Sequence, residues 1–503
     1  MEKYAYWKRN KEILLALGLT LGLMAAFKLF GVLVYDTNDD TIMASLSYGY
    51  YGVPEEKLIY IHPLLGTFMA ALQRTEPAFP WYYLVELGIL GLSITALYWM
   101  VLRKKEIKQV LPELAVLTVL LVQTMLFRLQ YTKIAGCASA AGMLLMFQAA
   151  EDRRRWWWGT CFVRPILVCP VRLLIWNKNQ SYSDTQWQNY QKYNRLRTEL
   201  MDYGFPDYSE NRSLYESLGI TEEDLTLYKS WDFGDPERFT VGKMQALCQA
   251  KKATGFSLRE LLSSAKASVR GLMSYDFAAG VLVAALLAFT FGGRKSLPLT
   301  LYELLALFGT ETWMMYTGRG LRERVDGALV ISVCMVLLII CCRGTENKMS
   351  RRGCALLAAA IVLCQVPDFL ARKDDAMERY VGAAHLQAAF QVMSKDKDTF
   401  YFTRTDELPP DRMPGRQGDF GYYSNIGTLG GWLTQSPYIL ERNAAHGIKN
   451  PFRDMVNSDS IRLVSNDIQP VLNYICRYYA PNARAIEVDS IRGEYAVWKI
   501  VAQ

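Results

Sequence analysis

The chain has 503 residues, of which 51% are hydrophobic and 21% are charged, and its formal net charge is +7. The apolar residues gather in long runs and leave two polar blocks, roughly 177–270 and 370–503, so a uniformly soluble protein is excluded and a membrane protein with substantial aqueous parts is expected. The Lys and Arg residues stand in short clusters beside the apolar runs, which membrane topology explains better than a nucleic-acid partner.

A transmembrane helix needs about 20 mostly apolar residues, with shorter runs at the low end of the range. Eight runs qualify: 13–35, 81–102, 110–129, 134–150, 275–291, 297–317, 327–342 and 353–368. Clusters of Lys and Arg mark the cytoplasmic side, so the clusters at 153–155 and 294–295 should both lie there. Only one of the eight runs, 275–291, lies between these clusters, and a single crossing would place them on opposite sides of the membrane. One more crossing is therefore required, and only 160–176 can supply it, despite Arg164 and Arg172.

Nine crossings give a polytopic α-helical protein of the cell membrane whose N-terminus is cytoplasmic. The first apolar run has no small-residue cleavage site after it, so we expect an uncleaved first helix. In this topology the loop 36–80, the large loop 177–270, the loop 318–326 and the C-terminal block all lie on the outer face. We expect two domains, a transmembrane domain at 1–368 and an extracytoplasmic domain at 369–503.

The C-terminal block alternates predicted strands and helices. "TFYFT" and "SIRLVS" are typical of strands and "DIQPVLNYICRYYA" of an amphipathic helix. "ARAIEVDSI" and "EYAVWKIV" predict a strand pair that turns at Arg492-Gly493, so we expect a small α/β domain. The segment 424–437, "SNIGTLGGWLTQSP", is rich in glycine but lacks the Lys-Ser/Thr pair of a P-loop.

The large outer loop is polar but aromatic. Its aromatic residues are candidates for stacking on sugar rings, and the plainer interpretation is that they form a small core of their own. They are Trp187, Tyr190, Tyr193, Tyr203, Trp231 and Phe233.

An acidic cluster, "YDTNDD", directly follows the first crossing and carries Asp36, Asp39 and Asp40. A carboxylate at a membrane surface can act as a general base toward a hydroxyl group, and two or three together can hold a divalent cation against phosphate oxygens. The alternative is that Asp39 or Asp40 simply caps the next helix.

An arginine loop, "GRGLRERV", carries Arg319, Arg322 and Arg324 on the face where positive charge is least expected. Arginine binds phosphate through paired hydrogen bonds, so this loop is a candidate for contact with a lipid phosphate. The alternative is that the three side chains only reach up to lipid headgroups.

Ionisable residues within crossings usually face a cavity or a partner. Lys28 lies two turns before Asp36 on the first crossing, and Glu311 lies near the end of the run 297–317. We expect Lys28 either to pair with a carboxylate of the acidic cluster or to reach the headgroups, and Glu311 to pair with Arg319.

Together, the "NDD" motif after the first crossing, the "GR…RV" loop and the outer C-terminal domain resemble the GT-C class of glycosyltransferases. These are integral membrane enzymes that take sugars from polyprenyl-phosphate donors. The likeness is to bacterial members that build surface polysaccharides, and it implies transfer to a cell-envelope glycan or a lipid-linked acceptor.

The resemblance also implies roles for the residues. Asp39 or Asp40 would be the catalytic base, with Asp36 a weaker third candidate, and a single displacement would invert the anomeric configuration. Where a divalent cation such as Mg²⁺ or Mn²⁺ is used, Asp39 and Asp40 would help to bind it. The arginine loop would face the donor phosphate, with Lys28 and Glu311 in support.

Other functions fit parts of the pattern. A flippase or polysaccharide exporter would explain the charges within the membrane and the outer arginines, but it gives no role to the acidic cluster. A non-catalytic scaffold for envelope assembly would use the C-terminal domain to bind partners. An O-antigen polymerase or ligase shares the lipid-linked substrate but needs no acidic pair after the first crossing.

Overall fold

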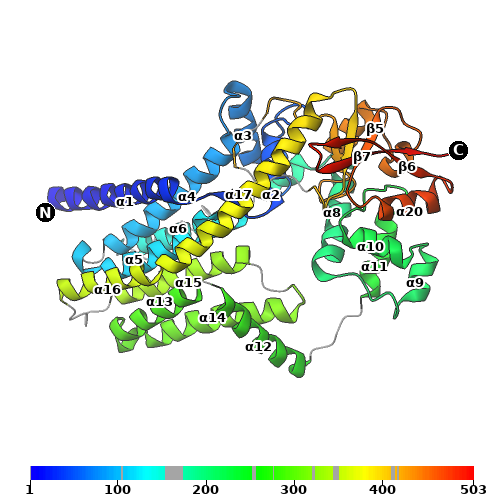
Figure 1. Cartoon of the computed structure of the whole chain (residues 1–503). Coiled ribbons are helices and arrows are strands. Elements are labelled where there is room, and N and C mark those ends of the chain that lie inside the picture. The colour runs from blue at the N-terminus through cyan, green and yellow to red at the C-terminus, as the bar shows by residue number, and fades with distance from the viewer. Residues whose placement is uncertain are drawn as a thin grey trace.

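The computed structural model describes residues 2–103, 106–152, 174–251, 257–275, 277–319, 323–343, 350–408, 414–415 and 418–503. Figure 1 shows two parts: a bundle of long helices near the N-terminus, and a domain built around a β-sheet where the chain ends. The long helix α17 (Val366–Lys395) runs from one part to the other (Figure 1).

The helical part is packed around one apolar helix. Its helices are α1 (Glu2–Phe30), α4 (Trp81–Leu102), α5 (Leu111–Leu121), α6 (Tyr131–Asp152), α13 (Ala278–Phe291), α14 (Leu297–Tyr316), α15 (Glu323–Arg343) and α16 (Arg351–Cys364). α15 contacts α4, α5, α6, α13 and α14, and its Val330, Leu337 and Leu338 are fully buried. A helix that is apolar on all sides is expected at such a centre.

Several of these helices are long and apolar enough to cross a membrane. Within the described residues they are Lys11–Phe30, Trp81–Leu102, Glu323–Cys342 and the combined helix Arg351–Lys395. A fifth span arises if α13 and the preceding helix α12 (Leu258–Ser274), which meet at a bend of 97°, form one broken span. The chain is therefore compatible with a helical membrane protein.

The residues that the structure describes do not show all of the nine predicted crossings. Helices occupy eight of the predicted positions, but α5, α13 and α16 have only 11, 14 and 14 residues. The predicted crossing at 160–176 lies almost entirely outside the described residues, so it rests on the sequence alone. The helical backbone also continues past the predicted domain boundary at 368, because α17 extends to Lys395.

The first loop begins where α5 gives way to a short strand that pairs with the strand after α1. α5 continues as a π-helix (Val122–Leu126) and then becomes the short strand β2 (Arg128–Leu129). β2 pairs in parallel with β1 (Val34–Tyr35), the strand that follows α1. This joint fixes where the chain leaves the bundle and begins α2 (Asn38–Ser47), the helix that opens with the acidic cluster; α3 (Pro63–Thr75) follows.

The C-terminal part holds a five-stranded mixed sheet with the strand order β4-β3-β5-β7-β6. Its strands are β3 (Phe400–Thr403), β4 (Ile426–Thr428), β5 (Ile461–Val464), β6 (Arg484–Ile491) and β7 (Tyr495–Val501). The three strands β4, β3 and β5 are parallel, whereas β7 is antiparallel to both β5 and β6. The predicted closing strand pair is confirmed: Arg492 and Gly493 turn the chain at φ 59° and 70°.

Helices from two regions of the sequence pack around this sheet domain. The C-terminal block adds α18 (Pro437–Ala445), α19 (Pro451–Asp454) and α20 (Gln469–Tyr478), and the large loop adds α8 (Thr185–Tyr203), α9 (Arg212–Ser217), α10 (Glu222–Lys229) and α11 (Val241–Ala250). One apolar core unites them, in which Trp187, Tyr190, Tyr193 and Phe233 are buried. For these four aromatic residues the core interpretation is therefore correct.

The first loop joins the bundle to the sheet domain. The backbone N–H of Tyr423 donates to the carbonyl of Tyr50 at 2.7 Å, and the rings of Tyr60 and Trp432 lie 4.8 Å apart. The ammonium group of Lys57 lies 4.8 Å from the Trp187 ring of the large loop. The first loop, the large loop and the C-terminal block thus meet at one end of the bundle (Figure 1).

Candidate functional site

The acidic cluster and the arginine loop meet in the structure. Nη1 of Arg324, in the first turn of α15, donates a hydrogen bond to Oδ2 of Asp39, in the first turn of α2, at 2.9 Å. The two residues are 285 positions apart in the sequence. Their side chains are 31% and 16% exposed, so the pair is held in place but remains open to a ligand.

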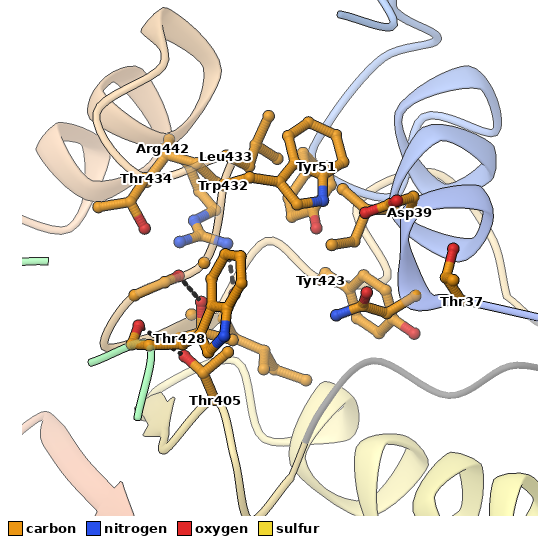
Figure 2. Close-up of a pocket in the computed structure, with 18 of the residues that line it drawn as sticks. Thr37, Asp39, Tyr51, Thr405, Tyr423, Thr428, Trp432, Leu433, Thr434 and Arg442 are labelled. Carbon is orange, nitrogen blue, oxygen red and sulfur yellow. Dashed lines mark hydrogen bonds between the residues drawn. The ribbon is translucent and has the colours of Figure 1, made fainter. Parts of the chain in front are cut away.

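A cavity of about 340 Å³ lies at this pair, which is within the size range of small-molecule sites. Its walls come from α2 and the first loop, from α8, from the segment after α10, from α17 and from the sheet domain. Figure 2 shows Asp39 of the first loop at one side of this space and Arg442 of the sheet domain at the other. The cavity therefore lies between the bundle and the sheet domain.

The glycine-rich segment 424–437 forms one wall. A Cβ atom at Gly430 would lie 1.6 Å from the carbonyl oxygen of Trp231, and the N–H of Gly431 donates to that oxygen at 3.1 Å. The glycines thus let two backbones approach each other, rather than form a phosphate cradle. As a result Trp231 and Trp432 line the same cavity.

Asp40 faces away from the cavity. It is 0% exposed, and its Oδ1 accepts hydrogen bonds from the Tyr82 hydroxyl at 3.2 Å and from the backbone N–H of Tyr131 at 2.9 Å. Glu86 lies beside it, and burial raises the pKa of Asp40 above its ordinary value. A covered carboxyl cannot touch a substrate, so the geometry favours Asp39 over Asp40 as a base.

Asp36 is held by a residue that the sequence analysis did not single out. Its Oδ2 lies 3.1 Å from Nζ of Lys133, a fully buried lysine at the start of α6. Lys28 is exposed, and in the part of the chain that the structure describes no ion pair joins it to the acidic cluster. The expected pairing of Lys28 with this cluster is therefore not formed.

The other predicted residues of the arginine loop lie apart from the cavity. Arg319 is exposed just after α14, and Arg322 lies outside the described residues. Glu311 is buried in α14, where its carboxyl contacts that of Asp326 in α15, so the expected pairing with Arg319 is wrong. Of the described arginines in this loop, Arg324 is the one that reaches the acidic cluster.

The acidic cluster does not offer the carboxylates that the implied cation site would need. Asp39 points to Arg324, whereas Asp40 is turned toward Tyr82 and Tyr131. Within the described ranges, no group of three or more His, Cys, Asp or Glu side chains is placed to hold a metal ion. A divalent cation at this cluster stays a prediction that the donor geometry does not favour.

Several cavity residues escaped the sequence analysis, among them Asp202, Tyr51 and Arg442. Asp202 lies near the end of α8 and Arg442 in the last turn of α18, positions where charged residues are common on ordinary surface helices. No local pattern marks them, because the cavity is assembled from segments far apart in the chain.

Comparison with known proteins adds no relative: no protein-family model, no curated protein and no solved structure matches this chain. The functional argument therefore depends on the residues of the cavity themselves.

Proposed function

We propose that the protein is a membrane glycosyltransferase of the GT-C type, which moves a sugar from a polyprenyl-phosphate donor to a glycan or a lipid-linked acceptor of the cell envelope. The observation that carries the proposal is the pair of Asp39 and Arg324 at the cavity. Such a transfer needs a carboxylate to accept a proton and a cation to face a phosphate. The pair supplies both groups at one position.

The chemistry of the cavity walls suits a sugar. Tyr51, Trp231 and Trp432 provide aromatic faces, and Thr405 and Thr428 provide hydroxyl groups. Aromatic rings pack against the C–H faces of a sugar ring, while hydroxyl groups exchange hydrogen bonds with its oxygens.

The surroundings of the cavity suit a lipid-linked donor. The cavity lies where the apolar helical bundle meets the sheet domain, so a donor can keep its hydrocarbon tail in the bilayer while its sugar enters the cavity. The Lys and Arg cluster at 294–295 precedes α14, and the cluster at 351–352 begins α16. Both clusters stand at helix ends that do not lead into the first loop or the sheet domain, and such clusters favour the cytoplasmic side for those ends. The cavity would then open outside the cell membrane.

The transfer follows from the positions of the two groups. The carboxylate of Asp39 takes the proton of the acceptor hydroxyl as its oxygen attacks the anomeric carbon. The bond from that carbon to the phosphate oxygen breaks, and polyprenyl phosphate leaves with the negative charge. Arg324 binds Asp39 through Nη1, and its other N–H groups can stabilise the charge that develops on the leaving phosphate. One displacement inverts the anomeric carbon.

The experiment measures transfer by the purified protein in detergent. A panel of polyprenyl-phosphate sugars with labelled hexoses is supplied, and release of polyprenyl phosphate is followed. Because a general base contributes about 10²–10⁴-fold to a reaction rate, we expect Asp39→Asn to lower the transfer rate by that factor. Arg324→Gln should also lower the rate, whereas Glu487→Gln, an exposed carboxylate on β6, should leave it unchanged.

Two results would reject the proposal. Transfer by Asp39→Asn at the wild-type rate would remove the catalytic assignment. If no donor is consumed while vesicles that contain the protein carry lipid-linked glycan across the membrane, the protein is an exporter.

A further inference from the structure

Arg442 is a buried cation on the cavity wall. It belongs to α18, is only 7% exposed and lines the cavity. Figure 2 shows it on the opposite side of the cavity from Asp39. Among the residues that the structure describes, no carboxylate lies within ion-pair distance of its guanidinium group.

Within the described ranges, the hydrogen-bond and ring partners of this guanidinium group are all uncharged. Nη1 donates to the carbonyl of Ile426, and both Nε and Nη2 donate to Oδ1 of Asn443, at 3.3 and 3.0 Å. The ring centres of Tyr51 and Phe400 lie 5.5 and 5.3 Å from its central carbon. Because a guanidinium group has five N–H donors, these three hydrogen bonds leave two donors for a ligand.

A cation in this position is costly unless an anion joins it. Burial lowers the pKa of Arg442 to about 10, against the opposing effect of Tyr51. Aromatic faces offset part of the free energy that an arginine loses when it is removed from water. An anion that makes paired hydrogen bonds with the guanidinium group offsets more. The two aromatic rings stabilise the cation in part, but none of the groups that these interactions join to it carries a negative charge.

The backbone beside Arg442 is shaped around its guanidinium group. A Cβ atom at Gly427 would lie 2.9 Å from Nη2 of Arg442 and 3.0 Å from a ring carbon of Phe402. Glycine at this position thus leaves room for the guanidinium group at the cavity wall.

We propose that Arg442 binds an anionic group, a carboxylate or a phosphate, on a saccharide that occupies the cavity. The inference rests on the proposed function, because it names the kind of saccharide for the same site. Arg324 and Arg442 would then bind different groups. Arg324 binds the lipid phosphate beside Asp39, and Arg442, at the other side of the cavity, selects acidic over neutral sugars.

The test is a binding measurement that needs no transfer. Trp231 and Trp432 line the cavity, so quenching of tryptophan fluorescence in the full-length protein reports occupancy. The probes are glucuronate, glucose 6-phosphate, inorganic phosphate and neutral glucose, at constant ionic strength. We expect at least one anionic probe to bind about tenfold to a hundredfold more tightly than glucose, as a charge-assisted hydrogen bond would provide. The comparison between glucuronate and glucose 6-phosphate identifies the preferred group.

Three variants decide the role of Arg442. Arg442→Gln should lower the affinity for the anionic probe to that for glucose, while glucose binding stays the same. Arg442→Lys keeps the charge but loses the planar fork, so its preference should fall between the two. The exposed Arg484→Gln on β6 is the matched control and should bind as the wild type does.

The outcomes separate this inference from the proposed function. Equal affinity of the wild type for all four probes, or an unchanged preference in Arg442→Gln and Arg442→Lys, would overturn it. A preference for anions that depends on Arg442, in a protein that transfers no sugar, would support the anion site and would reject only the proposed transferase function.

Discussion

At the scale of single residues, two neighbouring aspartates have opposite environments. Asp39 lies at the cavity against Arg324, whereas Asp40 is covered by Tyr82 and Tyr131. A single step along the chain separates a group that can meet a ligand from a group that cannot. Asp40 is therefore a positioning residue, which anchors the first turn of α2 to α4 and α6 and so holds Asp39 at Arg324.

Asp40 makes stability depend on pH. Because burial raises its pKa, the folded protein holds this proton more tightly than the unfolded chain does. Its contribution to stability is therefore present at acid pH and is lost as the pH rises from the ordinary carboxyl range through the raised pKa. In Asp40→Asn this loss should disappear, so the melting temperature measured in detergent should fall less between acid and mildly alkaline pH.

The matched control for this prediction is Asp489→Asn, an exposed carboxyl on β6, which should keep the pH slope of the wild type. An identical slope in Asp40→Asn and the wild type would show that Asp40 is not the group that responds.

At the scale of elements, α12 is a surface helix with three faces. Leu258, Leu262, Val269 and Met273 are exposed on one face at helical spacing, while Ser268 is buried where the helix packs on α14. Arg259, Lys266 and Arg270 are exposed beside the apolar face. An apolar face with adjacent positive charge is typical of helices that lie in the headgroup region of a bilayer. The 97° bend between α12 and the apolar α13 gives the orientation that such a helix needs.

We expect α12 to lie on the membrane surface. In nanodiscs, a polarity-sensitive dye on Leu262→Cys should emit at shorter wavelength and be protected from a water-soluble quencher. The same dye on Ser263→Cys, one position along and on the polar face, should report water. Both variants are made with the exposed Cys364 replaced by Ser, and the unsubstituted background is subtracted. Equal quenching at the two positions would contradict a surface location.

The sequence predicts elements better than it predicts the site. The β6–β7 pair and α20 follow from local alternation, helical spacing and the Arg492-Gly493 turn, all of which lie within a few residues of one another. The contact of Asp39 with Arg324 could be anticipated only as a shared side of the membrane, because 285 residues separate the two. Arg442 gave no signal at all, since its importance comes from the burial that tertiary packing creates.

At the scale of the whole molecule, the cavity exists because the large loop and the sheet domain share one core. The segment around Trp231 crosses the segment around Gly430, and Gly234 adds a second close contact, with its N–H 2.7 Å from the carbonyl of Leu429. This crossing connects a wall from the middle of the chain with a wall from its C-terminal block. The first loop supplies Asp39 and the bundle helix α15 supplies Arg324 to the same space.

Substitution of Gly430 should open the cavity while the bundle stays folded. In Gly430→Ala the new Cβ would lie 1.6 Å from the Trp231 carbonyl oxygen, and because that atom is backbone, no side-chain rotation can relieve the clash. Overpacking of this kind costs about 1–3 kcal/mol. We expect faster hydrogen exchange at 228–236 and 426–434, weaker saccharide binding and unchanged exchange in α15. Gly382→Ala in α17, where a Cβ meets no atom within 4 Å, is the matched control and should leave exchange and binding as in the wild type. Since the two variants add the same methyl group, normal exchange and binding in Gly430→Ala would show that the crossing does not hold the cavity together.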